Sequence, residues 1–179
     1  MICNKTENCF QQMLKLYPDA GCDRKERCVM FCDRRSEAVC REKGKSYHLL
    51  NTEENRYKIL SVLIDGGVVV MDKQTPVDIK KCDYLFLADK EEGTKPIAVL
   101  IELKGVDIKK AIEQISNTLS LFEAAFGHCG KVYGRIVFAG GTPNIRNIPS
   151  YMSLQRELKK RGGDLAAAKN IVDRVQELI

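Results

Sequence analysis

No apolar run in this 179-residue chain approaches the ~20 residues that a membrane-spanning helix needs, so no such span is expected. Residues 1–10 are polar and contain no apolar signal segment, which argues against export and predicts a cytoplasmic location. Internal repeats and low-complexity tracts are also missing, which excludes repeat architectures. These absences leave one domain of ordinary size with a small appended segment.

Closely spaced cysteine pairs are another absence, although the chain has eight cysteines. Six lie in the first 40 residues (Cys3, Cys9, Cys22, Cys28, Cys32 and Cys40), and only Cys82 and Cys129 follow. Cys22, Cys28, Cys32 and Cys40 are enough thiols for a tetrahedral metal site, but no C-x-x-C pair is present among them. Cys28 and Cys32 share an apolar stripe with Phe31, so buried thiols are the favoured interpretation.

The overall composition is that of a folded protein. Hydrophobic residues make up 44% of the chain and charged residues 30%, which excludes a disordered chain. The formal net charge of +5 suits a polyanionic partner, although many proteins that bind no nucleic acid are equally basic. Charge alone therefore does not identify a partner.

Residues 1–45 are expected to form a helical N-terminal segment, separate from an α/β domain over residues 46–179. An amphipathic stretch over residues 8–16 ends at a Pro- and Gly-containing turn. Apolar residues at helical spacing predict a second helix over residues 23–41. The polar residues 42–45 are the expected boundary.

The rest of the chain alternates between helical and strand-like patterns. Thr52 is an expected N-cap for a helix over residues 52–64. Strands are expected over residues 67–72, 81–88, 97–104 and 134–139, and further helices over residues 107–122, 153–161 and 165–178. This order predicts an α/β fold with a mixed central sheet flanked by helices.

The strand expected over residues 97–104 carries two charges within the apolar sequence IAVLIELK. Glu102 and Lys104 are two residues apart, so their side chains leave the strand on the same face. Burying charges is costly unless they are paired or bind a metal. A simple Glu–Lys ion pair at the strand end is the alternative interpretation.

A second carboxylate strengthens the case for a site. Asp83 lies on the apolar strand expected over residues 81–88, and the polar turn at residues 89–94 predicts a hairpin with the next strand. Asp83, Glu102 and Lys104 are therefore expected to meet on adjacent strands.

An Asp on one strand and Glu-X-Lys on the next, within a helix–three strands–helix–strand order, resembles the PD-(D/E)XK nuclease superfamily. The matching residues are Asp83 and Glu102-Leu103-Lys104, and the resemblance covers residues 52–140. One departure is Cys82, which stands where a proline often precedes the Asp. The resemblance implies a restriction-endonuclease-like fold and a Mg²⁺-dependent endonuclease, with Mn²⁺ able to substitute.

The resemblance also implies roles for individual residues. Asp83, Glu102 and the backbone carbonyl of Leu103 would hold the metal, and Lys104 would act on the attacking water and the developing charge. Glu53 is a candidate extra ligand with Glu54 as its rival, although stabilisation of a helix N-terminus is the favoured explanation of both.

Gln114 is the candidate substrate-binding residue, since related nucleases often carry a Gln on this helix, although a solvent-facing role is slightly favoured. Lys109, Lys110 and Arg135 could contact phosphates, but ordinary surface charge is the favoured explanation of each. His48 and His128 are isolated and receive no role.

The expected partner is nucleic acid, most simply DNA cut by a homodimer in a restriction, defence or repair setting. Aromatic residues interleaved with basic ones and base-recognition motifs are missing, which weakens sequence-specific binding. The alternatives are an RNA-cleaving enzyme, or a binding or assembly module in which the chemistry of the fold is unused.

Overall fold

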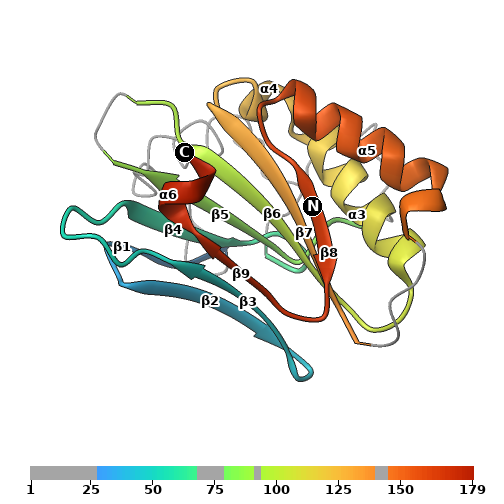
Figure 1. The fold of residues 1–179 in the computed structure, drawn as a ribbon, viewed down its shortest axis with the longest axis horizontal. Helices are drawn as coiled ribbons and strands as arrows, with labels where there is room; N and C mark the ends of the chain where they lie inside the picture. The colour runs from blue at the N-terminus through green and yellow to red at the C-terminus, as the bar shows by residue number, and fades with distance from the viewer. Residues whose placement is uncertain (1–27, 68–78, 91–93, 140–144) are drawn as a thin grey trace.

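The structure is a computed structural model that describes residues 28–67, 79–90, 94–139 and 145–179. Its centre is a six-stranded sheet in the order β1-β4-β5-β6-β7-β8 (Figure 1). The strands are β1 (Val29–Asp33), β4 (Lys58–Leu63), β5 (Tyr84–Asp89), β6 (Ile97–Lys104), β7 (Lys131–Phe138) and β8 (Leu165–Ala168).

This sheet is mixed, as expected from the sequence. Strands β1, β4, β5 and β6 pair antiparallel, whereas β6, β7 and β8 pair parallel. Parallel neighbours require long crossovers, and helices supply them. α3 (Ile108–Leu121) and α4 (Glu123–Phe126) connect β6 to β7, and η1 (Ile145–Asn147) and α5 (Pro149–Lys160) lie between β7 and β8. The α/β class is thus confirmed.

The two faces of the large sheet are covered differently (Figure 1). Helices α3 and α5 pack on one face, around a core that includes Leu100 and Ile112. A three-stranded sheet of β2 (Glu37–Glu42), β3 (Lys45–Leu50) and β9 (Ile171–Arg174) covers the other, and α6 (Val175–Leu178) follows it. Because both faces are buried, β6 is apolar almost throughout.

The helix expected over residues 23–41 is wrong for residues 29–41, which form β1 and β2. A register shift in β1 between Val29 and Phe31 places Val29 against the helix-side core and Phe31 against the core under the small sheet. Cys28 and Cys32 pack toward the helices and Phe31 toward the small sheet, so their spacing imitates a helical stripe. The antiparallel pairing of β2 with β3 also runs across the boundary expected at residue 45.

Two other expected helices are also corrected. Residues 58–63 of the expected 52–64 helix form β4, which buries side chains on both faces between β1 and β5. The region expected as a helix over residues 165–178 holds β8, β9 and the short α6. Pairing of β8 with β7 overrides the helix propensity of its alanines.

The strands expected over residues 81–88, 97–104 and 134–139 and the helices expected over residues 107–122 and 153–161 are present, but helices flank only one face of the large sheet. β6 has the expected bounds, and α3 begins after the N-cap Asp107, whose Oδ1 accepts the Lys110 backbone N–H at 3.0 Å. The helix over residues 8–16 and nearly all of the strand over residues 67–72 lie outside the described residues. Among the residues that are described, no helix is both long and apolar enough to cross a membrane.

Candidate active site

Asp83 and Glu102 lie at the same end of the β5–β6 pair. The ladder ends at Tyr84 opposite Ile101, so Asp83 stands one position further on, opposite Glu102. Opposed residues of antiparallel strands share a face of the sheet. The Asp83 backbone stays attached to the sheet, because its carbonyl accepts the Ile64 N–H at 2.9 Å. Its carboxylate turns to β6, where Oδ2 accepts the Leu103 N–H at 2.7 Å.

Glu102 is a buried carboxylate with an incomplete set of partners. Its side chain is 1% exposed, and Oε1 lies 3.2 Å from the Lys104 Nζ. Oε2 is buried and has no hydrogen-bond partner within the described part of the chain. Leaving a buried acceptor unpaired costs about 1–3 kcal/mol, and more for a charged group. Glu102 Oε2 can therefore accept one more hydrogen bond or contact one more positive group.

The side-chain amide of Gln114 on α3 holds Lys104 in position. The Lys104 ammonium donates to Gln114 Oε1 at 2.5 Å, and Gln114 Nε2 donates to the Lys81 carbonyl at 2.8 Å. Gln114 is only 4% exposed. The solvent-facing role favoured from the sequence is therefore wrong, and the side-chain amide is committed to the protein rather than to a substrate.

Further polar residues of α3 attach the chain that leads into Asp83. Asn117 Nδ2 donates to the Lys80 carbonyl at 3.1 Å. Thr118 Oγ1 accepts the Cys82 N–H at 2.8 Å and donates to the Gln114 carbonyl at 2.8 Å. Together with Gln114, these side chains bind the backbone of residues 80–82. The sequence does not indicate the roles of Asn117 and Thr118, because a polar residue on an amphipathic helix carries no sign of its partner.

The pKa values of both carboxyl groups are raised, because the single Lys104 ammonium does not offset their burial and mutual repulsion. Burial raises the pKa of Glu102 to about 8; the Asp83 carboxylate adds to the rise, and Lys104 opposes it. Burial also raises the pKa of Asp83 to about 6, against the Leu103 N–H, which lowers it. Glu42 adds a further increase at Asp83. A bound cation would relieve this imbalance.

Glu42 was not anticipated in the sequence analysis. It ends β2 next to the turn at Lys43 and Gly44, where both residues have positive φ (46° and 77°). Such turns join two-residue hairpins, and this one brings Glu42 near Asp83. The Glu42 carboxylate pairs with the Lys43 Nζ at 3.1 Å. The Gly44 turn between two alternating segments was the sequence feature that could have predicted this hairpin.

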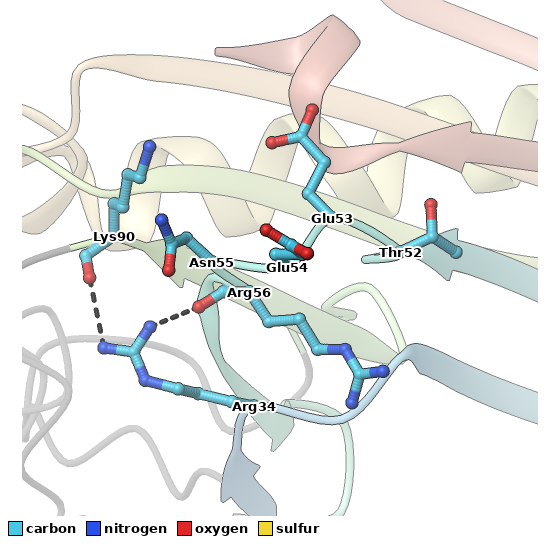
Figure 2. A pocket seen from close by; sticks show the side chains of 7 residues that line it. All are labelled: Arg34, Thr52, Glu53, Glu54, Asn55, Arg56 and Lys90. Atoms are coloured by element: carbon cyan, nitrogen blue, oxygen red, sulfur yellow. Dashed lines mark hydrogen bonds between the residues drawn. The ribbon is translucent and has the colours of Figure 1, made fainter.

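Glu53 is not part of this site, so both the extra-ligand role and the favoured role at a helix N-terminus are wrong. The helix that would have presented it is a loop before β4. β4 pairs with β5 from Lys58 opposite Asp89 to Leu63 opposite Tyr84, so Glu53 lies at the end of the strands away from Asp83. Glu53 and Glu54 line an open pocket there, beside Arg34 (Figure 2).

Arg135 is buried, not a surface charge or a phosphate contact. It is 2% exposed, and its guanidinium pairs with Asp164 and Asp173, each at 2.5 Å. Arg135 thus joins β7 to the segments around β8 and β9. Lys109 is exposed on α3, and Lys110 is partly buried one residue later.

The cysteines that are described do not converge. Cys28 and Cys32 pack beneath the helices, whereas Cys40 packs beneath the small sheet. Burial raises the pKa of Cys40 to about 12, so its thiol stays protonated near neutral pH. Cys22 lies outside the described residues. Across the described ranges, no group of three or more His, Cys, Asp or Glu side chains is placed to hold a metal ion.

No family model, no curated protein and no solved structure matches this chain. Function therefore has to be inferred from the side chains themselves. A buried carboxylate with an unpartnered oxygen, next to a second, half-buried one, can hold a hard cation, and the ammonium beside them can stabilise growing negative charge.

Proposed function

We propose that this chain is a metal-dependent nuclease that hydrolyses phosphodiester bonds in DNA, acting in the cytoplasm in defence, restriction or repair. The observation that carries this function is the meeting of Asp83, Glu102 and Lys104 at one end of β5 and β6. The antiparallel β4–β5–β6 unit, followed by α3 and the parallel β7, supports the resemblance to the PD-(D/E)XK superfamily.

The donor set fits Mg²⁺, with Mn²⁺ as a substitute. Asp83 and Glu102 would be the carboxylate ligands, and the resemblance adds the Leu103 carbonyl. Mg²⁺ prefers oxygen ligands and takes one or two carboxylates while keeping waters. The buried, unpartnered Oε2 of Glu102 supports a cation at this position. A bound Mg²⁺ supplies charge that lowers the pKa of a water and offsets the charge of the transition state.

Lys104 would act on the substrate rather than on the ion. Gln114 and Glu102 hold its ammonium at the mouth of the carboxylate pair. From there its remaining N–H donor can orient the attacking water or donate to a non-bridging phosphate oxygen. Such a donor contributes most as charge grows on the phosphate, because it is already positioned.

A homodimer is part of this proposal, because one active site cuts one strand at a time. Two copies related by two-fold symmetry would present two sites to a duplex. Light scattering during gel filtration measures the mass directly. A monomer at working concentration that still cuts both strands in one binding event would contradict the dimer.

The test is cleavage of plasmid, single-stranded DNA and RNA in Mg²⁺, Mn²⁺ or EDTA. Asp83→Asn and Glu102→Gln remove a charge with little change of shape and should abolish cutting. Glu53→Gln is the matched control, since its carboxylate lies at the other end of the strands. Undiminished cutting in EDTA would refute the metal mechanism. Preferred cutting of RNA would change the substrate, and binding without cutting would favour the binding module.

A further inference from the structure

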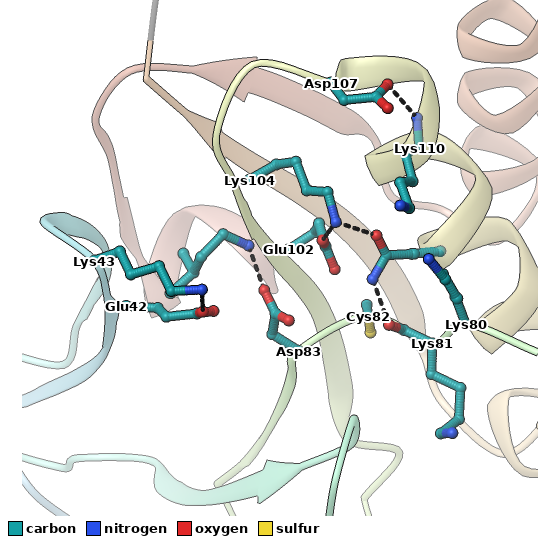
Figure 3. A network of polar contacts seen from close by, with 12 residues as sticks. Glu42, Lys43, Lys80, Lys81, Cys82, Asp83, Glu102, Lys104, Asp107 and Lys110 are labelled. Atoms are coloured by element: carbon teal, nitrogen blue, oxygen red, sulfur yellow. Dashed lines mark hydrogen bonds and ion pairs between the residues drawn. The ribbon is translucent and has the colours of Figure 1, made fainter. Parts of the chain in front are cut away.

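Two lysine side chains beside the candidate active site lie close together. Lys80 precedes β5, and Lys110 lies in the first turn of α3. Figure 3 shows the ends of both side chains beside each other, on the side of Lys104 away from Asp83. Neither Lys80 nor Lys110 forms an ion pair with a carboxylate in the part of the chain that the structure describes.

The fold keeps these two ammonium groups together. Asn117 binds the Lys80 carbonyl, and Gln114 binds the carbonyl of the next residue, Lys81. Gln114 and Asn117 lie one and two turns after Lys110, so the segment carrying Lys80 runs along the same face of α3. The nearby Asp107 carboxylate accepts the Lys110 backbone N–H instead of pairing with an ammonium.

The charges around this pair are mostly positive. Contact with Lys110 is the main cause that lowers the pKa of Lys80, and Lys104 lowers it further. Glu113 acts in the opposite direction, but as the weakest of these influences. Like charges at short range repel each other, so an anion that contacts both ammonium groups would relieve the repulsion.

We propose that Lys80 and Lys110 together bind one phosphodiester group of the nucleic acid backbone, next to the group that is cut at Asp83 and Glu102. This inference rests on the proposed function. An ammonium has three N–H donors, and a phosphodiester has two charged non-bridging oxygens, so two lysines can share one phosphate. The contact holds the strand in register and reads no base, in keeping with the lack of base-recognition motifs.

The open pocket at the other end of the strands is a weaker candidate for an anion. It holds Glu53 and Glu54 beside its basic residues (Figure 2). The Arg34 guanidinium there already donates to the backbone carbonyls of Arg56 and Lys90, the latter at 3.1 Å. Among the residues that the structure describes, neither the Lys80 nor the Lys110 ammonium pairs with a carboxylate or donates to a backbone carbonyl.

The test compares DNA binding by wild type, Lys80→Ala, Lys110→Ala and the double variant. Fluorescence anisotropy of a short labelled duplex in Ca²⁺, over a series of salt concentrations, measures affinity and its salt dependence without turnover. Lys160→Ala is the matched control. Lys160 is exposed at the end of α5, near the start of β7. Lys104 lies beside Phe138 at the other end of β7, so Lys160 is at the opposite end of the sheet from the candidate site.

The double variant should bind about tenfold more weakly at 0.1 M salt, and the slope of log affinity against log salt should fall by about 1. Its thermal midpoint should not fall, because the change removes two mutually repelling surface charges. A slope equal to that of Lys160→Ala would overturn the site. A fall of about 2 would mean two separate phosphates and would overturn the shared contact.

Cleavage by the same proteins separates this inference from the proposed function. If wild type cuts DNA and the double variant binds and cuts like Lys160→Ala, the phosphate site is wrong and the nuclease stands. If the double variant loses the salt slope while wild type never cuts, the phosphate site stands and the nuclease is wrong. If wild type neither binds nor cuts nucleic acid, both are wrong.

Discussion

At the scale of single residues, the proposed nuclease assigns metal binding and charge stabilisation to different side chains. Asp83 and Glu102 present carboxylate oxygens, and Lys104 is held beside them by Gln114. Removing a ligand and removing the ammonium should therefore have different consequences.

Lys104→Ala should slow single-turnover cleavage by about 10²-fold or more, the range for loss of one electrostatic catalytic group. DNA binding in Ca²⁺ should be nearly intact, since the ammonium is not a ligand. Asp83→Ala should also weaken metal binding, which a calcium or manganese titration measures. If Lys104→Ala cuts at the wild-type rate, the lysine is only the ion-pair partner of Glu102.

The raised pKa of Glu102 predicts how stability without metal depends on pH. The folded-state pKa of about 8 exceeds the ordinary value of 4.5, so the folded state binds the proton more tightly. In EDTA, the free energy of unfolding should therefore fall as pH rises from about 4.5 through 8, by on the order of a few kcal/mol. Asp83 should add a smaller fall between about pH 4 and 6.

Urea unfolding at several pH values measures this slope. Glu102→Gln should flatten it, because the amide does not titrate, and should make the metal-free protein more stable than wild type at pH 8. Glu53→Gln should retain the wild-type slope, since that side chain is exposed. Equal slopes in wild type and Glu102→Gln would show that Glu102 is not the titrating group.

At the scale of elements, α3 positions the site through its hydrogen bonds to residues 80–82. Thr118 is the central contact, because its hydroxyl accepts the Cys82 N–H and donates to the Gln114 carbonyl. Asp83 follows Cys82 directly. The helix that packs on the sheet therefore also sets where one of the two carboxylates lies.

Thr118→Val keeps the shape of this side chain but removes the hydroxyl. It leaves the Cys82 N–H buried without an acceptor, so the free energy of unfolding should fall by about 1–3 kcal/mol. Cleavage should slow as well, because the hydrogen bond that holds the backbone directly before Asp83 is lost. Thr118→Ser retains the hydroxyl and is the control. If the valine and serine variants match in stability and rate, this hydrogen bond does not hold the segment.

At the scale of the whole molecule, the small sheet packs on one face of the large sheet, and a largely buried cluster of charges joins the two. Arg135 on β7 pairs with Asp173 on β9, and Tyr47 on β3 donates to the same carboxylate at 2.9 Å. This cluster connects the large sheet with the small one. It therefore affects the stability of the whole fold.

Arg135→Met should lower the free energy of unfolding by about 3–5 kcal/mol, because it removes the buried guanidinium that pairs with the half-buried Asp173 carboxylate. Arg161→Met is the control, since its ion pairs with Glu123 and Glu157 are longer and closer to solvent, and it should cost at most about 1 kcal/mol. Chemical denaturation of both variants measures the difference. Equal losses would contradict the structural role of Arg135.

Local pattern was enough to determine the central part of this protein. The apolar sequence of β6 predicted a strand buried on both faces, and alternation along it placed Glu102 and Lys104 on one face. Asp107 followed by apolar residues at helical spacing predicted α3. These features depend on neighbours in the chain, so their periodicity is visible in the sequence.

Tertiary structure decided the rest, because strand pairing and burial join residues that are far apart in the chain. Cys28, Phe31 and Cys32 have the spacing of a buried helix face. In the structure they lie on or directly before a bulged strand, with Cys28 and Cys32 packed against one core and Phe31 against the other. Only the path of β4 shows that Glu53 lies away from Asp83. Likewise, the partners of Gln114 and Lys110 are backbone and side chains about 30 residues earlier, and no local period encodes such contacts.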